Sequence, residues 1–404
     1  MTTSLLIITG SYPFGVGTDF LENEIGWHAA MFDRVVLLPL VPHGARGPVP
    51  ANVEVDLGMV KLLRTRPRRV FSAFRSPRSI RLLREAIHSR GAPPALDSWL
   101  HLLAAVGIAE RVHEWGDRHR DDRPAIALTV WAGPATIGAA RSGIPTVTRA
   151  HGADLYAERH SHDFMPMQQE VFASAVAIHP VSAQGASYLR NRFPDLSSRI
   201  AVRHLGVPGA GAIAPASSDG VVRIVSCSSL TEVKRPRHLA EIIREVGRVV
   251  PAVHWDHFGS GPMESDVRIV AAAFPASVTW TLHGEVPNYQ VVEHYETNPV
   301  DVFLNSSSSE GVPVSMMEAM SAGIPVVAPS VGGVAEIVNE SNGRLVPADW
   351  GPAEVAGRLI ETIAEFAAVP RSLIQEQWAH DFSAEANYRA FAEELLGLAK
   401  VAIG

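Results

Sequence analysis

The sequence predicts an α/β protein with two open, doubly wound parallel sheets that follow one another along the chain. Short apolar segments bounded by turn residues alternate with longer amphipathic segments, as in consecutive strand–helix units. The alternation stops at residues 206–220, which contain four glycines and no helical or strand pattern, and then restarts. With 404 residues, 47% hydrophobic and 19% charged, the chain is long enough for two domains.

The first domain is expected at residues 1–205. Its strands are predicted at Ser4–Thr9, Arg34–Leu40, Ala125–Val130, Thr146–Ala150, Val176–Pro180 and Ile200–His204. Helices are predicted at Thr18–Met31 and Asp97–Arg118. Residues 206–220 are interpreted as the interdomain linker.

The second domain is expected at residues 221–375. Its strands are predicted within residues 221–229, 254–261, 277–284, 300–306, 324–330 and 343–348, and its first helix within residues 237–250. Ala353–Ala402 has a helical pattern throughout, and helix 376–404 is expected to pack back on the first domain. Two such sheets are expected to face each other across a cleft that holds the ligands.

Composition excludes several classes of protein. The single cysteine, Cys227, excludes an internal disulfide and a multi-cysteine metal site, and it fits a reducing compartment. The N-terminal sequence lacks the pattern of a secretory signal, and no apolar run reaches the roughly 20 residues that span a bilayer. The net charge of −7 at pH 7 is unlike that of a general nucleic-acid binder. We therefore expect a cytoplasmic protein with no nucleic-acid partner.

The positive charge is concentrated in residues 61–90. This segment holds ten Lys or Arg and one acid, Glu85, with apolar residues between the arginines. Such a mixture suits a surface that meets anionic phosphates or lipid head groups on the inner face of a membrane, and equally a solvated basic face over an ordinary core. Pro67 and Pro77 exclude one continuous helix.

The most informative window contains two glutamates eight residues apart, Glu310 and Glu318. A helix is expected to begin between Pro313 and Ser315, which leaves Glu310 in a loop and Glu318 inside the helix. Backbone N–H groups at the start of a helix lack partners and favour an anion. Either acid alone would be interpreted as a solvated side chain, whereas the combination favours binding of a sugar, a diphosphate and a ribose.

This window resembles the E-x7-E signature of retaining glycosyltransferases of family 4, which have the two-lobed GT-B fold. The similarity continues through residues 321–346. It implies that Glu310 contacts the donor sugar and that Glu318 holds the nucleotide ribose. The resemblance assigns the diphosphate-binding segment between them to Gly311, Val312, Pro313, Val314 and Ser315, in which the proline contributes shape but no N–H.

Residues 227–236, CSSLTEVKRP, resemble the family's strand-end motif, in which an arginine and a lysine neutralise the leaving diphosphate. Lys234 lies at the lysine position, but Ser229 stands where the family has arginine. Arg235 and Arg149 are the candidate substitutes for the missing cation. The turn formed by Gly259, Ser260 and Gly261 resembles the family's glycine turn beside the donor nucleotide.

In the first domain, His151 and Asp154 lie in the segment TRAHGADLY, which resembles the family's His-Gly-x-Asp segment near the hexose. Gly10, Gly15 and Gly17 follow the first predicted strand and resemble a glycine-rich loop that contacts the diphosphate and the acceptor. The resemblance therefore implies a catalytic role for His151, a donor contact for Gly17, and acceptor-side roles for Asp154 and Gly15, with Arg149 nearby.

The sequence contains no Asp-x-Asp, Walker A, His-Glu-x-x-His or Gly-x-Ser-x-Gly motif. We therefore expect no metal and no cofactor. The resemblance implies a retaining transferase that moves a hexose from a nucleotide-diphosphate sugar, UDP favoured over GDP, to a hydroxyl acceptor in exopolysaccharide, capsule or cell-wall assembly. Alternatives are a soluble small-molecule or natural-product acceptor, a nucleotide-sugar epimerase or phosphorylase of similar architecture, and a binding protein that has lost catalysis.

Overall fold

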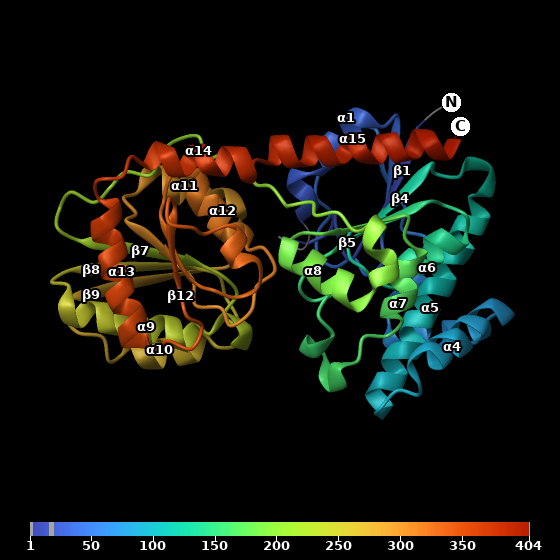
Figure 1. Ribbon diagram of the computed structural model, residues 1–404, viewed down its shortest axis with the longest axis horizontal. Helices are drawn as coiled ribbons and strands as arrows, with labels where there is room; N and C mark the ends of the chain where they lie inside the picture. Colours follow the sequence, from blue (N-terminus) through green and yellow to red (C-terminus); the bar gives the residue numbers. More distant parts are fainter. Residues whose placement is uncertain (1–2, 16–19, 404) are drawn as a thin grey trace. The chain divides into compact units, whose positions relative to one another are not determined.

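The computed structural model describes residues 3–15 and 20–403 (Figure 1). The chain divides into two units. Unit 1 comprises residues 1–204 and 388–404, and unit 2 comprises residues 205–387. In the described part of the chain, each unit contains one parallel sheet of six strands.

The sheet of unit 1 is doubly wound. Its strands are β1 (Ser4–Thr9), β2 (Arg34–Pro39), β3 (Val53–Val55), β4 (Ile126–Thr129), β5 (Thr146–Ala150) and β6 (Ala177–Pro180). Their order in the sheet is β3-β2-β1-β4-β5-β6, and every neighbouring pair is parallel. Strands β1, β4 and β5 are almost wholly buried because helices cover both faces of the sheet.

Side chains of β1 alternate between the two faces of this sheet. Leu5 and Ile7 pack against Phe391 and Leu395 of the C-terminal helix, whereas Leu6 packs toward helices of the opposite layer. The helices are α1 (Ile25–Met31), α2 (Val60–Leu63), α3 (Arg66–Ser72), α4 (Pro77–Arg90), α5 (Leu96–Arg118), α6 (Pro134–Arg141), α7 (Gln168–Ser174), α8 (Ala183–Arg192) and, from residue 388 on, α15 (Ala384–Ile403). Five short 3-10 helices complete the described part of this unit: Phe20–Asn23, Arg120–Asp122, Ala157–Arg159, Ser161–Asp163 and Pro194–Arg199.

The sheet of unit 2 repeats the same winding. Its strands are β7 (Val222–Cys227), β8 (Val253–Phe258), β9 (Val278–Gly284), β10 (Val302–Leu304), β11 (Val326–Pro329) and β12 (Gly343–Val346). The order is β12-β11-β10-β7-β8-β9, again with every neighbouring pair parallel.

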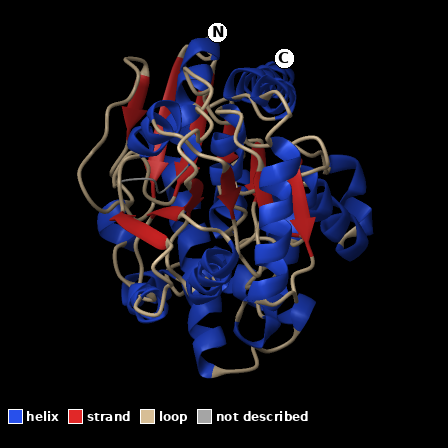
Figure 2. Ribbon diagram, turned by 90° about the vertical axis from the view of Figure 1, so that its left-hand side faces the viewer, coloured by secondary structure: helices blue, strands red, loops and turns tan. Residues whose placement is uncertain are grey.

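Helices cover both faces of the sheet of unit 2 (Figures 1 and 2). The helices are α9 (Pro236–Val249), α10 (Glu264–Ala271), α11 (Asn288–Thr297), α12 (Val314–Ser321), α13 (Pro352–Phe366) and α14 (Arg371–Asp381), with 3-10 helices at Glu232–Lys234 and Gly332–Glu336. Helix α9 packs with α10 and α13, while α12 packs with α11 and α14.

The α/β class and the two parallel, doubly wound sheets are confirmed. The strand predicted at Ile200–His204 is wrong. Ala201 and Arg203 donate backbone hydrogen bonds to β6, but only Ile200 forms a β-bridge, so this segment lies along the sheet edge without becoming a strand. The short strand β3 was not predicted, because its three residues are too few to show a period.

Three helical predictions need refinement. Of the predicted helix Thr18–Met31, the described part is a 3-10 turn followed by α1, and residues 18 and 19 lie outside the described residues. The helical pattern of Ala353–Ala402 is divided among α13, α14 and α15. The basic segment 61–90 is interrupted at both prolines, since Pro67 lies in the first turn of α3 and Pro77 begins α4.

Residues 206–220 have no helix or strand, and their backbone is bonded to unit 2. Ala214 donates from its N–H to the carbonyl of Ala322 and accepts from the Arg371 guanidinium at 2.9 Å. Within the described chain, no helix combines the length and the apolar character that crossing a membrane requires.

Candidate active site

The candidate site of unit 2 lies where the strand order reverses. Strands β7 and β10 are neighbours in the sheet, and the chain leaves them toward opposite edges. In open α/β sheets, ligands bind beyond the carboxyl ends of the strands at this point. The loop after β7 carries Lys234, and the loop after β10 carries Glu310.

Lys234 and Glu310 are paired at this position. The Lys234 ammonium donates to both carboxylate oxygens of Glu310, at 2.7 Å and 2.8 Å. The Glu310 side chain is 7% exposed and that of Lys234 is 24% exposed. The amide of Asn305, a residue that the sequence analysis did not single out, lies 3.4 Å from Glu310 Oε1. A cation and a carboxylate are therefore held together at a partly open strand end.

Backbone contacts fix the loop that carries Glu310. The Ser306 hydroxyl donates to the carbonyl of Lys234 at 2.8 Å, which ties the β10 loop to the β7 loop. Gly332 has φ of 56°, and a Cβ there would lie 1.9 Å from the carbonyl oxygen of Glu310. Gly333 donates its N–H to the carbonyl of Gly311 at 2.9 Å. Only glycine allows this close approach at position 332.

Helix α12 begins at Val314, within the range that the sequence predicts. Its N-cap is Pro313, and no side chain caps it. The amides of Val314 and Ser315 lie in the first turn, where backbone N–H groups have no partner inside the helix. Val312 is buried just before the helix. This arrangement is suitable for an anion beside Lys234.

Glu318 lies inside α12 and is 7% exposed. Asn288, the first residue of α11, donates to Glu318 Oε1 at 2.8 Å. Burial raises the pKa of Glu318 to about 7, against a smaller lowering by the Asn288 hydrogen bond. Near neutral pH both the ionised and the neutral form of this carboxyl are therefore populated, and its partner Asn288 is a residue that the sequence analysis did not single out.

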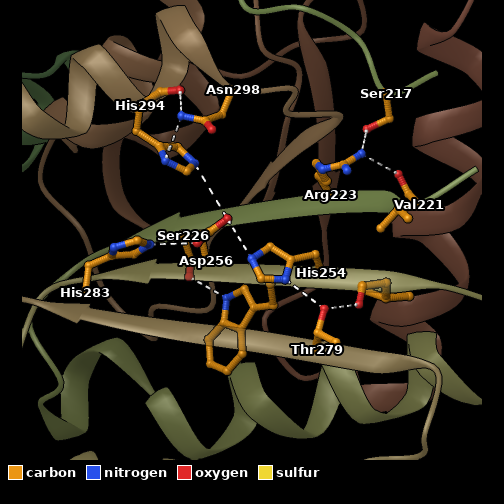
Figure 3. A network of polar contacts seen from close by, with 12 residues as sticks. Ser217, Val221, Arg223, Ser226, His254, Asp256, Thr279, His283, His294 and Asn298 are labelled. Atoms are coloured by element: carbon orange, nitrogen blue, oxygen red, sulfur yellow. Dashed lines mark hydrogen bonds and ion pairs between the residues drawn. The ribbon is translucent and has the colours of Figure 1, made fainter. Parts of the chain in front are cut away.

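A polar network fixes α11, which carries Asn288, to the sheet (Figure 3). Asp256 on β8 lies 2.6 Å from Nε2 of His283 on β9 and 3.6 Å from Nε2 of His294 on α11. His254 Nε2 is 3.3 Å from the same carboxylate. Burial raises the pKa of Asp256, but hydrogen bonds from His254 and His283 outweigh burial and lower it.

Among the described residues, no group of three or more His, Cys, Asp and Glu side chains could hold a metal ion.

Arg235, one candidate substitute for the missing arginine, bonds to a different loop. Ser229 is exposed, and its hydroxyl lies 3.4 Å from that of Thr231. Arg235 has φ of 50°, and its guanidinium donates to the carbonyl of Ala348, in the loop after β12, at 2.9 Å. Lys234 is thus the cation that lies against Glu310, while Arg235 is engaged with a different loop.

The turn at residues 259–261 packs against the loop after β7. Gly259 has φ of 128°, and a Cβ there would lie 2.0 Å from the carbonyl oxygen of Ser228. Leu230 donates its N–H to the carbonyl of Ser260 at 2.9 Å, and a Cβ on Gly261 would lie 2.5 Å from the carbonyl of Leu230. Both glycines are therefore needed for this loop to approach the Ser229 segment.

In unit 1, His151 and Asp154 follow β5 and lie together. The Asp154 carboxylate accepts from the N–H of His151 at 2.5 Å and from the N–H of Ala132, after β4, at 2.7 Å. The His151 ring is 6% exposed and lies 4.4 Å from the ring of Trp131. Asp154 thus joins two strand ends and positions the histidine.

Arg149 belongs to the buried framework of unit 1. It is 1% exposed and forms two 2.7 Å hydrogen bonds to the carboxylate of Glu24, which is fully buried and also contacts His28. Burial raises the pKa of Glu24, but the charge of Arg149 and the hydrogen bond with His28 outweigh it and lower the pKa to about 2. Because its guanidinium is enclosed with Glu24, Arg149 has no exposed surface with which to replace the cation missing at Ser229.

The glycine-rich loop after β1 is only partly described. Gly15 has φ of 87° and donates its N–H to the carbonyl of Ala45 at 3.0 Å. Gly10 has open space where a Cβ would lie. Gly17 lies outside the described residues. The left-handed conformation at Gly15 explains why glycine is required there.

Comparison with known proteins identifies a domain of unit 2. A family model described as "Glycosyl transferases group 1" matches residues 222–365, from the start of β7 into α13. The matched segment is thus similar to group 1 glycosyl transferases, and it contains Lys234, Glu310 and Glu318.

Two curated relatives extend the similarity. The Escherichia coli protein named as a colanic acid biosynthesis glycosyltransferase, WcaL, is 29% identical over 280 residues, which are 65% of this chain and 66% of that protein. The amylovoran biosynthesis glycosyltransferase AmsK of Erwinia amylovora is 28% identical over 186 residues, 44% of this chain and 45% of that protein. The match to WcaL spans just under two thirds of the length of that relative.

Solved structures establish the fold. The lipopolysaccharide outer core galactosyltransferase WaaB, in its apo form, has a TM-score of 0.66 at 14% identity and covers 100% of both chains. HepE of Anabaena, in complex with UDP and glucose, has a TM-score of 0.62 at 16% identity and covers 98% of this chain and 99% of that chain. The chain therefore has two Rossmann-like α/β domains with GT-B glycosyltransferases as structural neighbours.

Proposed function

We propose that the protein is a glycosyltransferase that moves a hexose from a nucleotide-diphosphate sugar to a hydroxyl acceptor, with retention at the anomeric carbon and without a metal ion. The observation that carries this proposal is the Lys234–Glu310 pair beyond the ends of β7 and β10. It lies inside the segment that matches group 1 glycosyl transferases. Retention, the hexose and the absence of a metal rest on the resemblance to family 4.

In the proposed reaction, the leaving phosphate oxygen takes the proton of the acceptor hydroxyl on the same face of the sugar. The protein then supplies positioning and charge stabilisation rather than a general base. Lys234 and the first amides of α12 hold the phosphates, Glu310 orients the hexose, and Glu318 accepts from the ribose. Because the Lys234 ammonium is bonded to the Glu310 carboxylate, an incoming diphosphate would replace Glu310 as the partner of the lysine.

In unit 1, we assign His151 to orientation of the hexose, as the resemblance implies. Asp154 then acts as a positioning residue, because it accepts from the His151 N–H and bonds to the end of β4.

We favour UDP as the nucleotide and an extracellular polysaccharide as the product. HepE was solved with UDP and glucose, and the pneumococcal transferase GtfA with UDP and GlcNAc. WcaL and AmsK are named for colanic acid and amylovoran biosynthesis. These names support a lipid-linked or glycan acceptor over a small molecule.

We place this activity in the cytoplasm, on the inner face of the membrane, with residues 61–90 in contact with the lipid surface. The exposed phenylalanines of this segment, Phe71 at 76% and Phe74 at 56%, lie among its arginines. Basic and aromatic side chains together favour the interface of an anionic membrane.

Proton NMR of donor hydrolysis tests the proposal, because water can replace the acceptor. Purified protein is incubated with UDP-hexoses in EDTA, and the anomer that is released first is identified. We expect slow release of the anomer that has the configuration of the donor. Release of the opposite anomer would overturn retention, and loss of activity in EDTA would overturn independence from metal. Absence of release and transfer with every nucleotide sugar would overturn the activity itself.

A further inference from the structure

A groove of about 840 Å³ opens between α4 and the pair α5 and α6 in unit 1. Its walls combine apolar side chains with arginines and one buried acid. The apolar part includes Ile80, Leu82 and Ile137, and Leu82 and Ile137 belong to the hydrophobic core beneath. This groove is formed by the outer helices and is separate from the strand ends that carry His151 and Asp154.

The arginines of the groove differ in their pairing. Arg78 donates to Asp117 at 2.7 Å, and Arg141 donates to Glu85 at 2.5 Å. Arg81 and Arg84 also line the groove, and the described residues offer them no ion-pair partner. Two arginines on successive turns of α4 are therefore available to an anion.

Glu110 of α5 supplies a second, independent observation. It lines the same groove and is 4% exposed, yet no hydrogen-bond donor among the described residues reaches its Oε1. A buried carboxylate oxygen without a donor is unfavourable unless a ligand or water supplies one. In the described part of the chain, the groove thus offers two exposed, unpaired arginines to an anion and one buried carboxylate oxygen to a hydrogen-bond donor.

We propose that this groove binds the head group of a phospholipid that carries both a phosphate and hydroxyl groups. The phosphate pairs with Arg81 and Arg84, a head-group hydroxyl donates to Glu110, and the apolar wall with Ile80 receives the start of an acyl chain. A simple anion would satisfy the arginines but not Glu110, and a neutral polyol would satisfy only the acid. This inference rests on the proposed membrane contact of residues 61–90 and gives that contact a specific lipid.

The test uses the full-length protein and vesicles of phosphatidylcholine that contain an equal mole fraction of either phosphatidylglycerol or phosphatidylmethanol. The two lipids carry the same charge, but only phosphatidylglycerol has hydroxyls to donate. We expect binding to phosphatidylglycerol vesicles to be about tenfold tighter or more, the effect of a hydrogen bond to a charged acceptor. Equal binding to both would overturn the role of Glu110.

Matched variants separate the groove from the general charge of the segment. Arg81→Gln with Arg84→Gln is expected to weaken binding to both vesicles about tenfold or more, whereas Arg64→Gln with Arg66→Gln, outside the groove, has a smaller effect. Equal losses from the two pairs would overturn the groove. Glu110→Gln is expected to bring the binding ratio of the two lipids close to one, and Glu114→Gln, one turn further along α5, to preserve it.

Two further measurements complete the test. Soluble glycerol phosphate is expected not to displace the protein from vesicles, because it lacks the acyl chain, and full displacement would assign the groove to a soluble phosphate instead. UDP binding without vesicles is expected to be unchanged in the groove variants. Absence of UDP binding in the parent protein would show that the proposed donor site is wrong. Loss of the lipid effects with UDP binding intact would show that only the lipid site is wrong.

Discussion

The two units have the same strand order, and each has an ion pair near its sheet, but the pair is enclosed in unit 1 and partly open in unit 2. The order β3-β2-β1-β4-β5-β6 of unit 1 corresponds strand by strand to the order β9-β8-β7-β10-β11-β12 of unit 2. In unit 1, Arg149 and Glu24 are enclosed, and Phe391 of α15 lies 4.6 Å from the guanidinium. In unit 2, Lys234 and Glu310 lie at the switch point, and the lysine is partly exposed. Burial of the cation therefore distinguishes the enclosed pair of unit 1 from the partly open pair of unit 2.

The largest expected effect is on the buried pair. Glu24→Gln leaves the charge of Arg149 buried without compensation and is expected to lower the free energy of unfolding by about 3–5 kcal/mol. Urea unfolding of the full-length protein measures this loss. Glu24→Gln combined with Arg149→Met removes both charges and is expected to recover part of it. An unchanged free energy of unfolding in Glu24→Gln would show that the Arg149–Glu24 pair contributes as little to stability as we expect of the Lys234–Glu310 pair.

The pH dependence of unfolding sharpens the same contrast. The pKa of Glu24 is lowered to about 2 in the folded protein, well below the usual range of a glutamate, because Arg149 and His28 outweigh burial. The stabilisation is then complete above the unfolded pKa and is lost as the pH falls toward 2. The Glu24→Gln variant is expected to lack this acid-dependent loss.

The next largest effect is on turnover. Glu310→Gln is expected to lower kcat by about 100-fold to 1,000-fold, because it removes the carboxylate that we propose orients the sugar. Its effect on unfolding is expected to be below about 1 kcal/mol, since the paired lysine can reach water. Steady-state kinetics and thermal unfolding of the same preparation measure both. A fall in stability without a fall in kcat would show that this pair, too, is structural.

Glu318 is expected to control donor affinity rather than turnover. Its pKa of about 7 means that the ionised acceptor is lost as the pH falls below neutral. Binding of a UDP-sugar, whose phosphates do not titrate in this range, is expected to weaken by roughly tenfold between about pH 8 and about pH 6. Glu318→Gln should raise the donor KM and remove this pH dependence, which calorimetric titration would show. An unchanged slope in the variant would exclude Glu318 as the titrating group.

The smallest expected effect comes from restoring a cation at Ser229. This residue is exposed beside the turn at Gly259, so an arginine fits without disturbing the core. Ser229→Arg is expected to tighten UDP binding by about threefold to tenfold through one further charged hydrogen bond. Ser265→Arg, an equal change of charge on α10, is the control. Equal gains in UDP affinity from both variants would show that the gain comes from the added charge in general and not from a contact at position 229.

The sequence predicted those features that depend on residues close to one another in the chain. Alternating apolar segments predicted the parallel strands, prolines predicted the breaks in residues 61–90, and Pro313 predicted the start of α12. Local spacing also identified Glu310 and Glu318. Where a segment lies at an edge, as Ile200–His204 does, apolar pattern alone does not distinguish a strand from a chain that runs beside one.

The remaining features depend on contacts between distant segments. Arg149 resembled a free strand-end cation because its partner, Glu24, lies 125 residues earlier in the chain. Asp256 is surrounded by histidines from β8, β9 and α11, which no spacing connects. Asn288 reaches Glu318 only because α11 packs against α12. Such partners follow from the fold and not from a motif.

The most direct test of the central claim is thermal unfolding with UDP, GDP, ADP and their sugars, with and without EDTA, in the parent protein and in Lys234→Met. A ligand that binds only the folded protein raises the midpoint according to its affinity. We predict a shift that is selective for one nucleotide, insensitive to EDTA and lost in Lys234→Met. Absence of a shift with any nucleotide, or an equal shift in the variant, would contradict the assignment of a donor site to Lys234 and Glu310.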